Sequence, residues 1–213
     1  MNLQHYYWVF QDAVPINVCD DILKYAQENK QAEREAITGD FGQNRNVVKK
    51  PLNKKKKDKL HRIRKSKVLW FDHRWIYKEI QPYVHEANRK ADWNYQWDWS
   101  ESCQFTKYSK GQFYDWHCDS WQGVYKDEGP QQGKVRKLSV TLCLNEPNEY
   151  EGGNLEFDFR NTHPDKGRKF ISSGRLSKGS LVVFPSFVWH RVTKVTKGTR
   201  YSLVIWNCGW PFK

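Results

Sequence analysis

The sequence predicts a mainly β domain with flanking helices, and two patterns along the chain lead to this fold class. From about residue 100 onward, short runs of β-branched and aromatic residues are separated at close intervals by Gly, Pro, Asn and Asp. That pattern is typical of a β-sandwich or barrel. Before residue 100, apolar residues recur at helical spacing. Aromatic residues make up 15% of the 213-residue chain, which gives it enough buriable area for one domain with a substantial core.

The first 98 residues predict a support made of helices and loops. One helix is expected over about residues 18–29, and a short strand over Val68–Phe71. A second helix should follow Asp72, with Pro82 kinking or restarting it. Its apolar stripe consists of Ile76, Ile80, Val84 and Ala87.

A lysine-rich segment, Lys49–Lys67, carries most of the positive charge. It holds 11 Lys or Arg against one acid, an excess of 10, while the whole chain has a formal net charge of +12. We interpret this segment as a solvated loop whose charges repel one another. Three functional interpretations stay open beside it: a contact for an acidic partner, a contact for nucleic-acid phosphates, and a lid.

The second half of the chain should hold the sheets. In Leu138–Leu144 large aliphatic residues alternate with small or polar ones, which predicts a half-buried strand. Further strands are expected over residues 103–108, 113–119, 154–159, 180–184, 188–195 and 200–207.

A candidate metal site begins with His117 and Asp119, which flank Cys118 in a predicted strand. Because side chains alternate along a strand, the imidazole and the carboxylate should point the same way. A second H-x-D, His163-Pro164-Asp165, lies in a turn-like sequence, and we set it aside as a decoy. With His190, the first pair makes two His and one carboxylate. This set suits non-haem Fe(II), because it leaves adjacent coordination positions open.

Arg200 opens a strand in which it shares a face with Ser202, Val204 and Trp206. If that face looks into the barrel, the guanidinium is buried, which is costly without a partner. A carboxylate on a small ligand would supply a bidentate partner. The alternative is an exposed arginine at a sheet edge.

The run from Tyr108 to Asp119, YSKGQFYDWHCD, resembles the Y-x-x-G-x-x-Y-x-x-H-x-D motif of prolyl hydroxylases in the Fe(II)/2-oxoglutarate dioxygenase superfamily. The similarity continues downstream in order and at family spacing, over roughly residues 100–207, and is closest to the small PKHD-type hydroxylases of bacteria and phages. The downstream matching segments are residues 138–145, 150–155, 179–186 and 190–200. The lysine-rich segment has no counterpart in the motif, and Lys194 stands where many PKHD-type members have proline.

The resemblance implies a role for each matching residue. It makes His117, Asp119 and His190 the iron ligands, and Arg200 the partner of the distal carboxylate of 2-oxoglutarate. Tyr108 and Ser202 are implied hydrogen-bond donors to this cosubstrate. Trp206 stands where nucleobase-repairing relatives carry a second arginine, which argues against a DNA demethylase.

The implied fold is a double-stranded β-helix, a cupin-like jelly roll, buttressed by the N-terminal helices. We expect a single dioxygenase domain over residues 1–213, with residues 1–98 as helical and loop support, including the lysine-rich loop 49–67, and residues 99–213 as the core. The implied cofactors are Fe(II), 2-oxoglutarate and O2, with L-ascorbate as a further candidate. The implied reaction hydroxylates an unactivated C–H bond while 2-oxoglutarate becomes succinate and CO2.

The expected substrate is a peptidyl proline in a peptide or protein, as in procollagen-type prolyl hydroxylases. Aromatic candidates to receive the proline ring are Tyr114, Trp116, Trp121 and Trp206, each of which could equally belong to the core. A lysine-rich lid would favour an acidic partner. Two alternatives stay open: a nucleic-acid-modifying oxygenase that uses the basic segment, and a cupin-like barrel that binds metal or ligand without turnover.

The sequence also predicts where the protein acts. The N-terminal residues lack the basic start and apolar block of a secretory signal, and Leu181–Trp189, the longest apolar stretch, falls short of the roughly 20 residues that a membrane helix needs. The five cysteines form no C-x-x-C pair and are expected to be reduced thiols. We therefore expect a cytoplasmic monomer with no membrane contact, in the host cytoplasm if the gene belongs to a phage.

Overall fold

The computed structural model describes residues 5–38, 54–120, 123–158, 170–172 and 174–212, and the side chains of all of these except 170–172. Three α-helices and one 3-10 helix occur among them: α1 (Ile16–Glu28), η2 (Lys30–Ala32), α2 (Lys54–Ile63) and α3 (Arg74–Lys90). The strands are β1 (Trp8–Phe10), β2 (Arg34–Glu35), β3 (Arg64–Lys65), β4 (Lys67–Phe71), β5 (Trp99–Ser100), β6 (Cys103–Ser109), β7 (Phe113–His117), β8 (Val135–Cys143), β9 (Tyr150–Gly152), β10 (Leu155–Asp158), β11 (Phe170–Ser172), β12 (Leu181–Pro185), β13 (His190–Val192) and β14 (Val195–Gly209).

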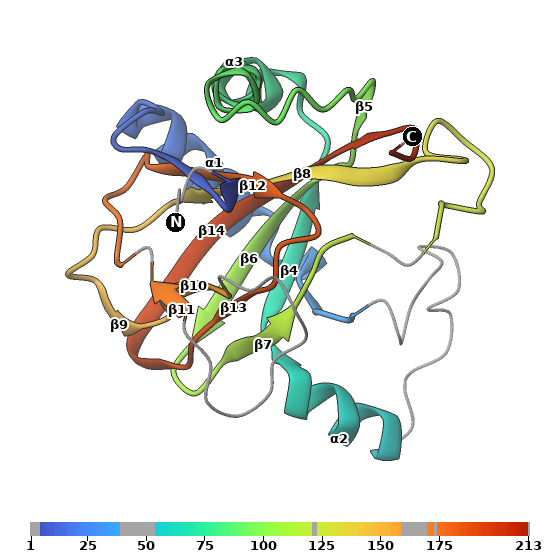
Figure 1. The fold of residues 1–213 in the computed structure, drawn as a ribbon. Coiled ribbons are helices and arrows are strands. Elements are labelled where there is room, and N and C mark those ends of the chain that lie inside the picture. The colour runs from blue at the N-terminus through green and yellow to red at the C-terminus, as the bar shows by residue number, and fades with distance from the viewer. Residues whose placement is uncertain (1–4, 39–53, 121–122, 159–169, 173, 213) are drawn as a thin grey trace.

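Two antiparallel sheets form the body of the molecule (Figure 1). The larger sheet has the order β1-β12-β8-β14-β6-β4-β2, and β5 and β9 also pair with β14. The smaller sheet has the order β11-β10-β13-β7-β3. This arrangement confirms the predicted fold class, a mainly β protein with helices at its flanks.

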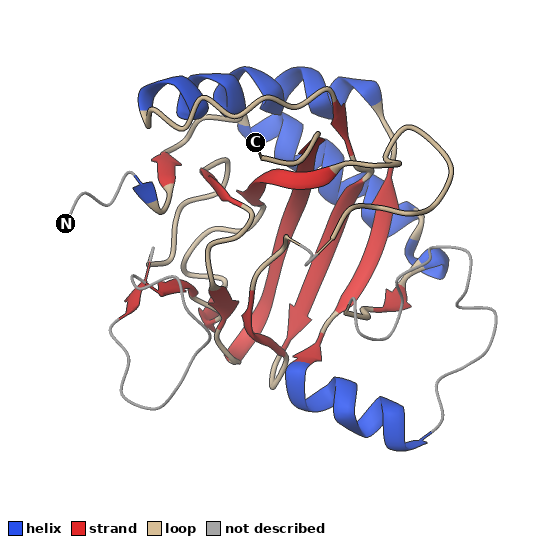
Figure 2. Ribbon diagram, turned by 45° about the vertical axis from the view of Figure 1, so that its right-hand side comes forward, coloured by secondary structure: helices blue, strands red, loops and turns tan. Residues whose placement is uncertain are grey.

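The outer face of the larger sheet is apolar and is covered by α1 and α3, which lie together on one side of it (Figure 2). Alternate residues of β14, Leu203 and Ile205, point to this face and belong to one buried cluster with the apolar stripes of both helices. The predicted stripe of α3 is confirmed in full. Burial of this much apolar area is the main stabilising term of the fold.

Pro82 does not restart α3, one of the two outcomes that we expected, because the helix runs unbroken from Arg74 to Lys90. Pro82 lies on the exposed side of the helix. There, water can satisfy the carbonyl that loses its hydrogen-bond donor, while the buried stripe on the other side holds the helix to the sheet.

The prediction of a lysine-rich loop over residues 49–67 is wrong for residues 54–67, the part that the structure describes. Residues 54–63 form α2, followed by the short strand β3. Lysine is a good helix former, and Leu60 anchors this helix by complete burial, so tertiary packing outweighs charge repulsion. Figure 1 shows α2 at the end of the molecule remote from α1 and α3.

The N-terminal region supplies more than support. Strand β1 extends the larger sheet at one edge, and β4 and β2 extend it at the other, while β3 pairs with β7 in the smaller sheet. The prediction of a half-buried strand at 138–144 is also wrong, since β8 is buried on both faces. One face packs under the helices, and the other faces the smaller sheet.

Every longer strand that the sequence predicts is present, and all five cysteines are free thiols, as expected. Among the described helices, none combines the length and the apolar character that crossing a bilayer would require.

Candidate metal centre

The inner face of the larger sheet, which looks toward the smaller sheet, is unusually polar for a buried surface. Because residues directly opposite each other in a sheet share a face, the register of β14 with β6 and β8 defines this surface. Its members include Gln104, Thr106, Tyr108, Ser139, Thr141, Arg200, Ser202 and Trp206. Such buried polar groups need partners, which makes the space between the sheets the place to look for a ligand site.

His117 and His190 face this space from the smaller sheet. They are paired directly across β7 and β13. Asp119 follows β7 and is held by its backbone, because its amide donates a 2.8 Å hydrogen bond to the carbonyl of Ser186.

A β-bulge in β7 turns His117 inward. His190 and Val192 are two residues apart in β13, whereas their partners His117 and Tyr114 are three apart in β7. The extra residue reverses the alternation of side chains, so Tyr114 and His117 lie on the same face and stack, with ring centroids 3.4 Å apart.

The three predicted ligands therefore meet. The Nε2 atom of His117 lies 3.7 Å from Asp119 Oδ1, and the Nε2 atom of His190 lies 3.6 Å from Asp119 Oδ2. One ligand atom from each side chain lies within 4.8 Å of the other two. Among the described residues, no other group of three His, Cys, Asp or Glu side chains comes together in this way.

Both imidazoles present the nitrogen that a metal needs. The Nδ1 atom of His117 lies 2.7 Å from the carbonyl oxygen of Asp115, and that of His190 lies 2.9 Å from the carbonyl oxygen of Val188. A carbonyl can only accept a hydrogen bond, so each Nδ1 carries the proton. Each Nε2 then keeps its lone pair and points toward Asp119, which is the tautomer of a metal ligand.

The protonation states also suit a cation. Burial and the neighbouring His190 hold the pKa of His117 well below its usual value, which keeps the ring neutral. Burial alone would raise the pKa of Asp119, but His190, His117 and Arg136 outweigh it and lower that pKa to about 2. Ser139 steadies the carboxylate by donating a 2.7 Å hydrogen bond to Oδ2. Two imidazoles and one carboxylate are the donor set of a divalent transition metal.

Arg200 lies buried on the same inner face, with a relative exposure of 4%. Its guanidinium donates a 3.0 Å hydrogen bond to Ser202 Oγ, and its Cζ lies 5.7 Å from the ring centroid of Tyr108. No ion pair among the described residues involves it. The alternative of an exposed edge arginine is therefore wrong.

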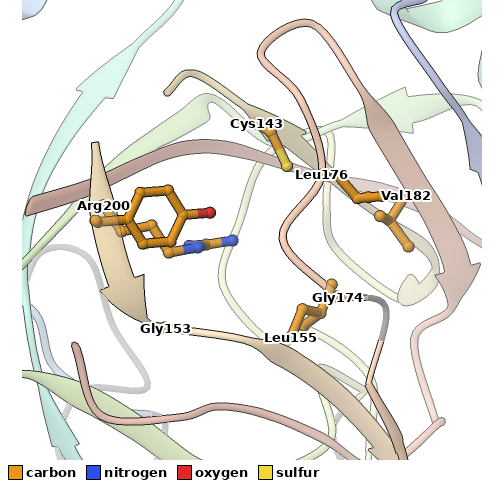
Figure 3. A pocket seen from close by; sticks show the side chains of 8 residues that line it. Cys143, Gly153, Leu155, Gly174, Leu176, Val182 and Arg200 are labelled. Carbon is orange, nitrogen blue, oxygen red and sulfur yellow. The ribbon is translucent and has the colours of Figure 1, made fainter. Parts of the chain in front are cut away.

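A pocket opens in front of Arg200, and Figure 3 shows the guanidinium reaching toward its centre. The walls are largely apolar, with Leu155, Leu176 and Val182 opposite the cation. The cavity volume is about 10 Å³, room for about one water molecule, so side chains must move to admit a ligand. The combination of a cation with aliphatic side chains suits a small carboxylate with a short aliphatic chain.

Two residues that line the pocket, Tyr150 and Gly153, were not predicted as site residues. Tyr150 lines the pocket beside Arg200, and hydrogen bonding with Arg200 partly offsets the rise that burial causes in the pKa of Tyr150. Gly153 lets the arginine pass, since a Cβ there would come within 2.9 Å of Arg200 Cδ. The Y-E-G-G run that contains both was visible in the sequence, but only the fold brings it next to Arg200.

The predicted substrate aromatics have different fates. Tyr114 stacks on His117. Trp116 lies on the opposite face of the smaller sheet, under Arg191, so the structure does not place it at the metal group. Trp206 is buried beneath Arg136, whose Cζ lies 3.9 Å from the centroid of the indole ring. Trp121 and the decoy His163 lie outside the described residues.

A further aromatic at the edge of the site was not predicted. Trp70, in β4, is 42% exposed, and its ring centroid lies 6.0 Å from that of Trp206. It sits opposite Gln104 in the sheet register and therefore on the inner face. Nothing in its local sequence distinguishes it from other tryptophans.

Comparison with known proteins points in the same direction. Residues 103–208 match the sequence profile of the 2OG-Fe(II) oxygenase superfamily. A PKHD-type hydroxylase of Acidovorax ebreus is 36% identical over 103 residues, and one of Picosynechococcus is 35% identical over 106 residues. These alignments cover 48% and 50% of this chain but only 41% of each relative, so the matched part is about two fifths of those proteins.

Two solved structures share the fold over nearly the whole chain. A prolyl-4-hydroxylase of Pseudomonas putida has a TM-score of 0.60 and 19% sequence identity, with coverage of 95% of this chain and 92% of its own. A viral collagen prolyl hydroxylase from Paramecium Bursaria Chlorella virus-1 has a TM-score of 0.61 and 18% identity, with coverage of 96% of both chains. At these identities the likeness concerns the fold.

Proposed function

The chain belongs to the 2OG-Fe(II) oxygenase superfamily, and from this premise we propose that it is a peptidyl prolyl hydroxylase. The reaction couples the oxidation of a C–H bond to the decarboxylation of 2-oxoglutarate. One oxygen atom of O2 enters succinate and the other enters the hydroxyl group, while CO2 leaves. The observation that carries the proposal is the His117, Asp119 and His190 group, which shares the space between the sheets with the buried Arg200.

The chain's own residues bind and orient the reactants. His117, Asp119 and His190 would hold Fe(II), which supplies the redox chemistry when bound. Arg200 would pair with the distal carboxylate of 2-oxoglutarate. Ser202 already accepts a hydrogen bond from Arg200, so its own hydroxyl proton is available to the same carboxylate. The apolar side chains of Leu155 and Val182 line the pocket in front of Arg200 and would pack on the aliphatic part of the bound cosubstrate.

The proline substrate rests on two kinds of support. The relatives are named PKHD-type hydroxylases, and the structural neighbours are titled prolyl hydroxylases. The exposed Trp70, beside the buried Trp206, offers an apolar surface on which a proline ring can pack at the edge of the site.

An acidic segment beside the target proline would suit the basic helix α2. Residues 54–63 contain five lysines and one arginine against one aspartate, and Lys54, Lys55 and Arg62 are exposed. The helix leads directly into β3, which pairs with the strand that carries His117. A peptide bound at the metal centre could therefore extend along α2, where negative charge would be attracted.

The test is to incubate the Fe(II)-loaded protein with 2-oxoglutarate and a library of proline-containing peptides, and to measure succinate and intact peptide mass together. We expect a gain of one oxygen that is matched by succinate and is lost when the target proline is replaced by alanine. Oligonucleotides form a parallel arm, and both arms run with and without ascorbate. Oxygen gain on oligonucleotides alone, or bound metal with no succinate under any condition, would contradict the proposal.

A further inference from the structure

Arg64 is a buried cation at the edge of the proposed metal centre, and it belongs neither to the metal ligands nor to the pocket in front of Arg200. Its side chain is 5% exposed, and no ion pair among the described residues involves it. Its Nε donates a 3.0 Å hydrogen bond to Ser66 Oγ, and NH2 donates a 2.9 Å bond to Gln104 Oε1. Burying a guanidinium among neutral partners costs free energy. An arginine at this position therefore indicates a role other than stability.

The position of Arg64 ties the two sheets together. It belongs to β3 at the edge of the smaller sheet, whereas Gln104 belongs to β6 in the larger sheet. These two hydrogen bonds, with a longer one of 3.5 Å from NH1 to the carbonyl oxygen of Ile37, fix the plane of the guanidinium, because its donors form a rigid fork. The group is thus held at one height between the sheets.

One ring separates this fixed cation from a metal ligand. Arg64 is the register partner of Tyr114, and its Cζ lies 4.4 Å from the centroid of the Tyr114 ring. The other side of that ring carries the imidazole of His117, with a centroid distance of 3.4 Å and an angle of 10° between the planes. Since the imidazole covers one face of the tyrosine, the guanidinium must lie against the other.

We propose that Arg64 is a positioning residue that clamps Tyr114 flat against His117 and thereby fixes the imidazole plane for metal binding. The β-bulge in β7 is what makes the stack geometrically available, because it brings Tyr114 and His117 to one face. The hydrogen bond from His117 Nδ1 to the backbone carbonyl of Asp115 restrains rotation of the imidazole within its own plane. Stacking on Tyr114 prevents the imidazole from tilting out of that plane. This inference rests on the proposed metal site, since it assigns a device that orients one of its ligands.

The experiment measures binding of Co(II) alone, without turnover, by titration and by the ligand-field spectrum of the bound ion. In Arg64→Gln we expect the dissociation constant to rise about tenfold, the lower end of the range for losing an outer partner of a metal-bound histidine. The Co(II) spectrum should change as well, because the imidazole is free to tilt. Arg64→Lys keeps the charge but not the planar fork, and should lie between wild type and Arg64→Gln.

Strand β7 offers a matched control on its other face. Arg191 packs over Trp116 at 4.8 Å from the ring centroid, also as a guanidinium on an aromatic ring. Arg191→Gln removes the same kind of contact with a residue of β7, together with a 2.6 Å ion pair to Glu156, but on the face away from His117, and should leave Co(II) affinity and spectrum unchanged.

A double-mutant cycle separates positioning from general stability. In Tyr114→Leu the aromatic ring between Arg64 and His117 is absent, so adding Arg64→Gln should cause no further loss of Co(II) affinity. If Arg64→Gln does not fold, Gln104→Met removes the 2.9 Å bond from Arg64, together with a 3.2 Å bond from Thr106 Oγ1, and should shift the spectrum in the same direction. The inference is overturned if folded Arg64→Gln binds Co(II) like wild type, or if its loss adds fully to that of Tyr114→Leu. Failure of wild type to bind Co(II) would instead overturn the metal site itself.

Discussion

The two faces of the larger sheet are built from the same strands but from opposite kinds of residue. On the outer face, Leu203 and Ile205 of β14 pack into the apolar cluster under α1 and α3. On the inner face, Arg200 lines the pocket and donates a hydrogen bond to Ser202, and Ser139 of the neighbouring β8 donates one to Asp119. Alternate residues of the same strand therefore contribute either to the stability of the fold or to the proposed site. Neighbours in sequence should therefore fail in different ways when they are changed.

The largest effect on stability is expected on the outer face. Leu203 is fully buried between the sheet and the helices. Leu203→Ala should lower the free energy of unfolding by about 2–5 kcal/mol, because it removes buried methyl groups and leaves a cavity. Urea denaturation of the metal-free protein measures this loss. A change smaller than that of an ordinary surface substitution would show that the outer face does not carry the stability.

The adjacent residue should show the reverse pattern. Ser202→Ala removes a hydroxyl that accepts a bond from Arg200, which should cost only about 1 kcal/mol of stability. We expect its affinity for 2-oxoglutarate, measured by anaerobic titration of the metal-loaded protein, to fall about tenfold, as for the loss of a hydrogen bond to a charged group. Unchanged affinity together with a large loss of stability would erase the distinction between the two faces.

The smallest effect is expected at α2. Replacing Lys54 and Lys55 by glutamate should raise the KM for an acidic, proline-containing peptide about threefold to tenfold, because each exposed ion pair contributes roughly 0.2–1 kcal/mol. The effect should fade as salt is added.

The matched control replaces Lys24 and Lys30, two exposed lysines at and after α1, by glutamate. The charge change is the same, but these residues belong to the helical side of the larger sheet. An equal rise of KM in both variants would mean that only the net charge matters and that α2 is not the contact.

The sequence was informative wherever a regular period or a dense motif existed. The stripe of α3 and the longer strands follow from periodicity, and the ligand set follows from a motif in which His117 and Asp119 are close in sequence. Very short strands such as β2 and β3 hold two residues each, which is too few for any period to emerge. Helix α2 was missed because its single fully buried residue, Leu60, gives no stripe.

The site itself was predictable only in part, for a physical reason. The bulge in β7 cannot be read from alternation, and without it Tyr114 and His117 would lie on opposite faces. Arg64 and Trp70 reach the inner face through strand pairing with residues about 35 to 50 positions away, a relation that local sequence does not encode. Trp116 lies on the face of β7 opposite to His117, because neighbours in a strand point to opposite faces.

We expect His117, Asp119 and His190 to bind one metal ion, which anaerobic Fe(II) titration measures. We predict one equivalent bound by the wild-type protein, no stoichiometric binding by His190→Ala, and unchanged binding by His163→Ala, which alters the second H-x-D sequence. Full binding by folded His190→Ala, or loss of binding in His163→Ala, would contradict the account.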